Sequence, residues 1–200
     1  MNPKKIDIIV VGVGGQGVIL ATEILGNAAL REELEVVISE VHGMAQRGGS
    51  VASHVRIGCD IYSPTIMEGS ADAILGFEPI ETLRALKFTN QDTRIVMNSK
   101  PIIPVTVSTG AYKYPSLNEV IEQCKRFTEH ITVLDAFKIA EEAGSSLAVN
   151  MVLMGALEAT GLLPIEEENL IQTIKEHVPQ EFVKVNLGAF DAGKRAAAPR

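Results

Sequence analysis

The sequence predicts an α/β fold: a Rossmann-like, mainly parallel sheet flanked by helices, with an inserted β-hairpin and a helical C-terminal part. Three observations lead to this prediction. Residues 6–11 form a continuous β-branched run, which is typical of a buried strand. A helical pattern over residues 17–32 follows at once, and further apolar strands and helices then alternate along the chain. From residue 137 onward the pattern is wholly helical.

The strands follow from short apolar runs. A second strand is expected at residues 35–39. Residues 51–57 alternate as a half-buried strand does, and residues 61–63 are expected to pair with them in a hairpin that turns near Gly58. The remaining expected strands are residues 71–76, 94–98, 104–107 and 131–134.

The helices follow from their start signals and their apolar faces. A helix is expected over residues 79–86, and another over 116–127 with Ser116 as its cap and Glu119 three residues later. Residues 146–162 are apolar on nearly every face, which indicates a helix that is either central or part of a subunit contact. The other expected helices are residues 137–143, a helix that begins near Pro164, and one from about 182 to 195.

Composition narrows the function classes. The chain has 200 residues and a formal net charge of −7, so we expect no nucleic-acid partner. No apolar stretch is long enough to span a membrane and no signal peptide is recognisable, so a cytoplasmic protein is expected. Two distant cysteines exclude a disulfide framework and a four-thiolate site, and no metal site is predicted. Without repeats or linkers, residues 1–200 are expected to form a single domain.

A glycine-rich motif joins the first strand to the first helix. Gly12, Gly14 and Gly17 form G-x-G-x-x-G in the strand-to-helix context that such a motif needs. The backbone amides of Gly15, Gln16 and Gly17 would then lie at the positive end of the helix, where an anion binds. The alternative is a turn that needs glycine only for close packing.

An acidic residue follows the second strand. Glu40 lies 23 positions after Gly17, near the place where a dinucleotide-binding fold holds the ribose hydroxyls. By itself this would make the chain an NAD-binding domain. The alternative is a solvated carboxylate at the end of a strand.

A second glycine-rich segment, residues 40–50, leaves the same edge of the sheet. Its glycines allow close approach of a ligand, Arg47 offers two parallel hydrogen bonds to an anion, and His42 titrates near neutrality. His42 and Arg47 are candidate accessory catalytic groups. The candidate binding residues of this segment are Glu40, Gln46, Arg47, Gly48, Gly49 and Ser50. The alternative is a surface loop whose polarity is incidental.

Both segments together resemble a known family. GVGGQGVILATEILGNAAL at 12–30 and EVHGMAQRGGSVASHVRIG at 40–58 are similar to the gamma-type subunit or domain of 2-oxoacid:ferredoxin oxidoreductases, and most similar to the beta (small) subunit of the indolepyruvate branch. The likeness continues through residues 61–86, 145–164 and 186–194, and so covers the whole chain.

The resemblance implies one subunit of an enzyme that converts a 2-oxo acid, coenzyme A and oxidised ferredoxin to acyl-CoA, carbon dioxide and reduced ferredoxin. It implies an aryl 2-oxo acid such as indolepyruvate as the substrate. It also implies a large partner subunit that carries thiamine diphosphate and 4Fe-4S clusters, while this chain binds no cofactor alone. Because coenzyme A is polyanionic and an amide-lined turn with Arg47 matches that charge, we expect residues 12–17 and 42–50 to lie near the coenzyme A entry or the partner's active site.

Two other functions stay open on the residues alone. One is an NAD(P)-binding oxidoreductase domain, which the glycines and Glu40 permit. The other is a non-catalytic module whose glycine segments only dock a partner. A homodimer of the isolated chain also stays open.

Overall fold

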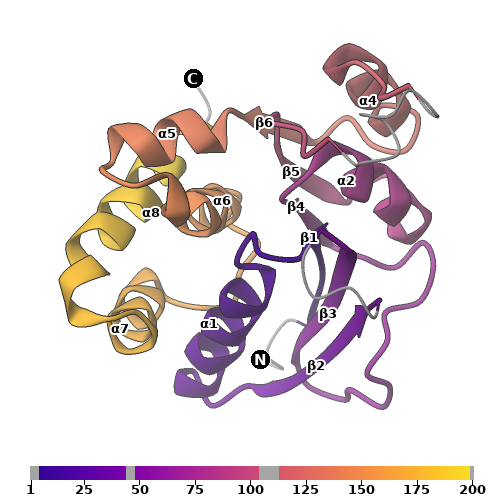
Figure 1. The fold of residues 1–200 in the computed structure, drawn as a ribbon. Coiled ribbons are helices and arrows are strands. Elements are labelled where there is room, and N and C mark those ends of the chain that lie inside the picture. The colour runs from indigo at the N-terminus through magenta and orange to yellow at the C-terminus, as the bar shows by residue number, and fades with distance from the viewer. Residues whose placement is uncertain (1–4, 44–47, 104–112, 199–200) are drawn as a thin grey trace.

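The computed structural model describes residues 5–43, 48–103 and 113–198. In this part of the chain six strands form a sheet with helices on both faces (Figure 1). The strands are β1 (Ile6–Val13), β2 (Glu35–His42), β3 (Ser50–Gly58), β4 (Ala73–Gly76), β5 (Arg94–Asn98) and β6 (Ile131–Leu134). The helices are α1 (Val18–Arg31), α2 (Pro79–Ala85), α4 (Leu117–Cys124), α5 (Ala136–Glu142), α6 (Val149–Glu158), α7 (Glu167–His177) and α8 (Val183–Ala197), with 3₁₀ turns at Leu86–Phe88, Ser146–Ala148 and Gln180–Phe182.

The sheet is mixed, and its strand order is β2-β3-β1-β4-β5-β6. The pairs β1–β4, β4–β5 and β5–β6 are parallel, whereas β3 is antiparallel to both β1 and β2. The predicted α/β fold with a mainly parallel sheet is therefore confirmed. The antiparallel part is an insertion of β3 between the first two strands.

The prediction that residues 51–57 pair with residues 61–63 in a hairpin is wrong. β3 pairs with β1 on one side and β2 on the other, so neither of its edges is free for residues 61–63, which form no strand. Instead the chain after Gly58 folds back over the sheet. Arg56 holds this segment by donating hydrogen bonds to the carbonyls of Ser63 and Thr65.

The two faces of the sheet carry separate cores. Ile8 and Val10 point to one face, which α1, α5, α6, α7 and α8 cover. Ile9 and Val11 point to the other face, which α2 and α4 cover. This alternation follows from the period of two along a strand. It places helices on both sides, as Figure 1 shows.

Helix α6 occupies the centre of the larger core. Its residues from Asn150 to Leu157 are buried, which explains a helix that is apolar all round. It lies against α8, α5, α1 and the sheet. Its own chain therefore covers it, and of the two expectations for residues 146–162 the structure supports the central position.

Several boundaries differ from the predicted ones. β2 continues to His42, so Glu40 lies within a strand and not in a loop. The capping box of Ser116 and Glu119 is present, but α4 ends at Cys124. The strand predicted at residues 104–107 lies outside the described residues. Within the described ranges, no helix is long and apolar enough to cross a membrane.

Candidate functional site

The glycine turn between β1 and α1 needs its glycines for different reasons. Gly15 has a φ of 103° and Gly17 a φ of 80°, a region that side chains with a Cβ disfavour. A Cβ on Gly12 would lie 2.8 Å from the Phe77 Cβ atom. Gly17 begins α1 without a side-chain cap, so the positive end of this helix is left to the turn itself.

The structure brings the second glycine segment next to this turn. The Gly14 N–H donates to the Gly49 carbonyl at 2.8 Å, and the Gly48 N–H donates to the Gly14 carbonyl at 3.3 Å. These bonds continue the β1–β3 ladder past Val13 and Ser50. The two glycine bends therefore share one edge of the sheet.

The other predicted residues of this segment have different placements. The Ser50 hydroxyl donates to the Glu81 carboxylate on α2, at 2.5 Å. Gln46 and Arg47 lie outside the described residues, and so does the side chain of His42. The described part of the segment therefore contributes backbone groups, and Ser50 is directed towards α2.

Gln16 has a structural contact on both ends of its carboxamide. Its Oε1 accepts from the Val13 N–H at 2.7 Å, and its Nε2 donates to the Phe77 carbonyl at 3.0 Å. The side chain thus ties the end of β1 to the end of β4. Its backbone amide donates to the Val13 carbonyl.

Glu40 lies away from the glycine turn. It pairs with Ser53, and Ser53 pairs with Val10, so β3 separates Glu40 from β1. Two strand spacings amount to about 10 Å. Dinucleotide-binding folds instead place the second strand beside the first. The structure therefore does not bring Glu40 and the glycine turn together, and the NAD(P)-binding alternative is not favoured.

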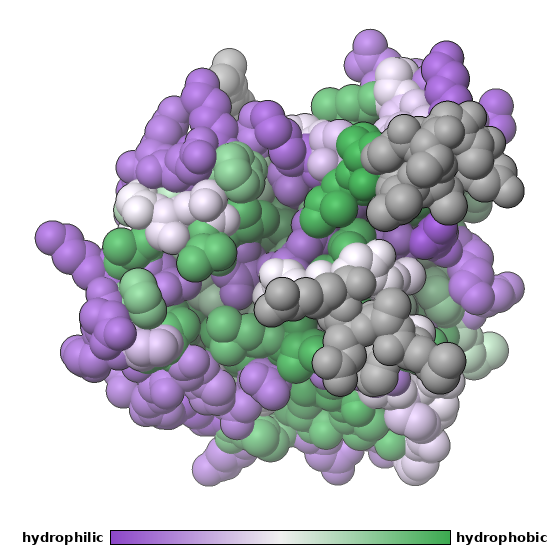
Figure 2. Space-filling model, in the orientation of Figure 1, coloured by the Kyte–Doolittle hydropathy of each residue, from purple (hydrophilic) through white to green (hydrophobic). Residues whose placement is uncertain are grey.

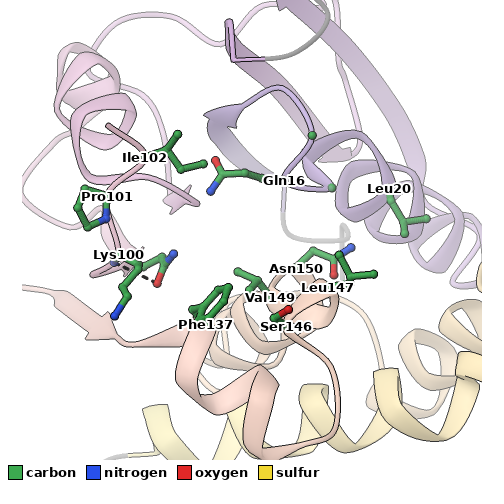
Figure 3. A pocket seen from close by; sticks show the side chains of 13 residues that line it. Gln16, Leu20, Lys100, Pro101, Ile102, Phe137, Ser146, Leu147, Val149 and Asn150 are labelled. Carbon is green, nitrogen blue, oxygen red and sulfur yellow. Dashed lines mark hydrogen bonds between the residues drawn. The ribbon is translucent and has the colours of Figure 1, made fainter. Parts of the chain in front are cut away.

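A cleft of about 560 Å³ opens beside the glycine turn (Figure 3). It lies where α1 follows β1 onto one face of the sheet and α2 follows β4 onto the other. Open α/β sheets bind ligands at such a switch point. The cleft is lined by Gly15, Gln16, Gly17, Leu20, Asn98, Lys100, Pro101, Ile102, Phe137, Ser146, Leu147, Val149 and Asn150.

A network of side-chain amides forms the base of the cleft. The Phe77 carbonyl accepts from Gln16 Nε2 and from Asn98 Nδ2, the latter at 3.2 Å. Asn98 Oδ1 accepts in turn from the Ala136 and Lys100 backbone amides. The ends of β1, β4, β5 and β6 are thereby joined side by side. This fixes the lining residues before any ligand arrives.

Glu78 holds the wall that follows β5. Its buried Oε1 accepts from the Ile102 N–H at 3.2 Å and from the Tyr114 hydroxyl. Burial, and then the hydrogen bond to Glu78, raise the pKa of Tyr114. The phenol therefore stays protonated as the donor of this pair.

Sequence reasoning missed most of the cleft. Lys100, Phe137 and Leu147 carry no motif, and they meet only through the fold. The signal that could have found the cleft is Asn150, a polar residue inside an otherwise apolar helix. In the described ranges no cluster of three or more His, Cys, Asp or Glu side chains could hold a metal ion.

The fold and this edge define a doubly wound α/β protein with two glycine bends and a cleft at its switch point. The chain belongs to the pyruvate ferredoxin/flavodoxin oxidoreductase family, whose model matches residues 7–196. This agrees with the resemblance found in the sequence.

Individual relatives narrow the comparison. The chain is 44% identical to the indolepyruvate oxidoreductase subunit IorB of Archaeoglobus fulgidus, over 96% of each chain. It is 43% identical to the subunit of the same name from Pyrococcus horikoshii, over 97% of this chain and 96% of that one. Among solved structures it is similar to the gamma subunit of the Geobacter sulfurreducens keto/oxoacid ferredoxin oxidoreductase, with a TM-score of 0.69 and 25% identity over 96% and 98% of the two chains.

Proposed function

We propose that this chain is the small subunit of an indolepyruvate-type 2-oxoacid:ferredoxin oxidoreductase. The observation that carries the proposal is the 44% identity to an indolepyruvate oxidoreductase subunit over 96% of both chains. The enzyme would convert an aryl 2-oxo acid, coenzyme A and oxidised ferredoxin to acyl-CoA, carbon dioxide and reduced ferredoxin. The whole chain, residues 1–200, would act as one domain of that assembly.

The redox cofactors would lie in a large partner subunit. A 4Fe-4S cluster is usually held by four thiolates, and this chain has two cysteines in all, so its own residues do not fit such a cluster. Cys124 is buried, and burial raises the pKa of its thiol to about 11, which disfavours the thiolate that a metal needs. The clusters are therefore assigned to the partner, where ferredoxin would accept the electrons. Thiamine diphosphate is assigned to the partner from the family resemblance.

The two glycine bends would form this chain's contribution to the active site. Gly12, Gly14, Gly15 and Gly17 line the turn at the positive end of α1, and Gly48 and Gly49 lie against it. Together with Arg47 they would contact the anionic part of coenzyme A or the facing surface of the partner. His42, Gln46 and Ser50 would be accessory groups of the same surface. Support for this comes from the adjacency of the bends and from the negative charge of coenzyme A.

Co-purification tests the assembly. The tagged full chain, isolated under anaerobic conditions from its native source, should carry a large second chain together with thiamine diphosphate and iron. A preparation that contains this chain alone, or a partner without either cofactor, would contradict the proposal.

Arg47→Ala tests the anion-binding role within the complex. Assembly should be retained while the KM for coenzyme A rises about tenfold, because one charge-assisted hydrogen bond is lost. Arg126→Ala, an exposed arginine that follows α4, is the matched control and should leave the KM unchanged. Loss of assembly in the Arg47 variant would instead assign the bends to docking.

A further inference from the structure

The cleft beside the glycine turn has a positive electrostatic character that its lining does not neutralise. Both α1, with Gly17 at its start, and α6, with Asn150 in its first turn, begin there. Neither helix has an acidic residue in its first turn or a side-chain cap. Helix α1 has 14 residues and helix α6 has 10. Both helices therefore direct their positive N-terminal ends towards the cleft.

Asn150 supplies an unused hydrogen-bond donor in this space. The residue is only 4% exposed, and its Oδ1 accepts from the neighbouring Met151 N–H at 3.0 Å. Its Nδ2 donates to no group among the described residues, whereas the carboxamides of Gln16 and Asn98 both donate to the Phe77 carbonyl. Asn150 lines the cleft, so an acceptor on a bound ligand would gain a hydrogen bond from this amide.

The rest of the lining fits an apolar body with one negative charge. Lys100 carries the only full charge among the described lining residues, and its Nζ lies a loose 3.8 Å from Asp135. Apolar side chains dominate the remainder, and they are Leu20, Pro101, Ile102, Phe137, Leu147 and Val149. Figure 2 shows apolar side chains gathered in the hollow between the region of α5 and α6 and the sheet edge. In Figure 3, Lys100 and Asn150 lie on different walls.

We infer that this cleft binds a monocarboxylate with an aromatic or branched apolar body. Its carboxylate accepts a hydrogen bond from Asn150 Nδ2 in the field of Lys100 and the two helix ends, and its body packs on Phe137 and Leu147. A polyanion such as coenzyme A fits poorly inside the cleft, because one lysine cannot balance several charges in an apolar lining. Coenzyme A would instead meet the glycine bends outside the cleft, on the side of Gly14, Gly48 and Gly49. A volume of about 560 Å³ is ample for one aromatic acid.

This inference rests on the proposed function only for the choice of test ligand. An aryl 2-oxo acid is an apolar monocarboxylate, so the cleft would give the small subunit its own site for the substrate class. No bond forms or breaks there. The carboxylate would be held beside the glycine turn, near the carboxyl ends of β1 and β5.

Calorimetric titration of the full chain with indole-3-acetate tests the inference. We expect saturable binding, and binding at least about tenfold weaker for indole-3-ethanol, which has the same ring system and no charge. Inorganic phosphate and coenzyme A, each in excess, should not displace indole-3-acetate. These competition experiments distinguish a site for a carboxylate with an apolar body from a site that binds any anion.

Two variants locate the binding in the cleft. Asn150→Leu removes the donor and Lys100→Met removes the charge, and each should weaken indole-3-acetate about tenfold. Lys125→Met is the control, because Lys125 is an exposed lysine paired with Glu122 on α4. Asn150 is buried, so thermal unfolding of N150L is measured first. Lys100→Met, at an exposed side chain, decides the result if N150L does not fold.

Several results would overturn the inference. They are an absence of saturable binding, equal binding of the neutral alcohol, full affinity in K100M, or displacement by coenzyme A or phosphate. None of these bears on whether the chain co-purifies with a cofactor-bearing partner. If the chain binds indole-3-acetate but co-purifies with no cofactor-bearing partner, the proposed function is contradicted and the assignment of the cleft still holds.

Discussion

Gly17 combines two constraints that are hard to satisfy with any other residue. Its φ of 80° disfavours a Cβ, and a Cβ there would lie 2.8 Å from Asn150 Nδ2. The position therefore couples the glycine turn to the first turn of α6. A change at Gly17 alters both the backbone of the turn and the buried carboxamide of the cleft.

Gly17→Ala should lower the free energy of unfolding by about 1–3 kcal/mol, because backbone strain and the Asn150 contact add. Urea denaturation of the full chain measures it. Gly188→Ala is the matched control, since Gly188 lies on α8 with no atom within 4 Å of an added Cβ. That change should be neutral or stabilise by up to about 1 kcal/mol. Equal losses in the two variants would contradict the account.

His54 is a structural histidine with a specific partner. Its Nδ1 accepts from the Ile66 N–H at 3.1 Å, and its ring meets Phe88 edge to face. Burial, followed by the charges of Lys87 and Arg56, lowers the pKa of His54 below its ordinary value of 6.5. The imidazole thus holds the segment after β3 in place.

His54→Asn should flatten the pH dependence of stability. The folded state binds fewer protons than the unfolded state once the pH falls below the ordinary pKa of 6.5, so stability from the neutral ring is present above 6.5 and lost on acidification. Asparagine keeps an acceptor for Ile66 and does not titrate. Between about pH 7.5 and 5, the Tm of the parent protein should therefore fall more steeply than that of H54N. Parallel Tm curves would show that His54 does not titrate on unfolding.

The close packing of α6 against α8 depends on two glycines, one on each helix. Each glycine lies against the backbone of the opposite helix. A Cβ on Gly155 would overlap the Phe190 carbonyl, and a Cβ on Gly193 would overlap the Val152 carbonyl. The close approach of these helices puts α6 in the centre of the core, and with it places Asn150 at the cleft.

Gly155→Ala should therefore destabilise the protein by about 3 kcal/mol, since the overlap is with backbone that cannot rotate away. Chemical denaturation measures the loss, with Gly188→Ala again as the control on the same helix pair. A loss below about 0.5 kcal/mol, the range of an ordinary surface change, would mean that the helices separate easily.

The elements could be predicted from the sequence to the extent that each is decided locally. The runs at β1, β4 and β5, the Ser116 capping box and the helices after residue 137 are local patterns, and the structure has them. The pairing of β3 could not be predicted in this way. Periodicity shows that residues 51–57 form a strand, but which neighbour fills each edge depends on the whole sheet.

The candidate site also has a part that could be predicted from local sequence patterns and a part that could not. The glycine motif and the segment before β3 have composition signals, and their adjacency follows from both leaving one edge of the sheet. The far wall of the cleft has no such signal, because Lys100 follows β5, Phe137 belongs to α5 and Leu147 precedes α6. Residues from distant parts of the sequence meet only when the sheet has formed.

At the scale of the whole molecule, several large apolar side chains are strongly exposed. They include Leu147, which is 87% exposed, and Tyr62, which is 89% exposed. Phe137 and Ile102 also reach the surface beside Leu147 at the cleft. An apolar surface of this kind at the mouth of the cleft is suited to the apolar body of a bound ligand.

Reconstitution of activity tests the central claim most directly. The purified chain, the large subunit loaded with thiamine diphosphate and iron–sulfur clusters, and their mixture are assayed for indolepyruvate- and coenzyme A-dependent reduction of ferredoxin. The account predicts negligible turnover by either chain alone and activity that saturates as this chain is titrated into its partner. Turnover by this chain alone, or a partner whose full activity is unchanged by adding it, would contradict the account.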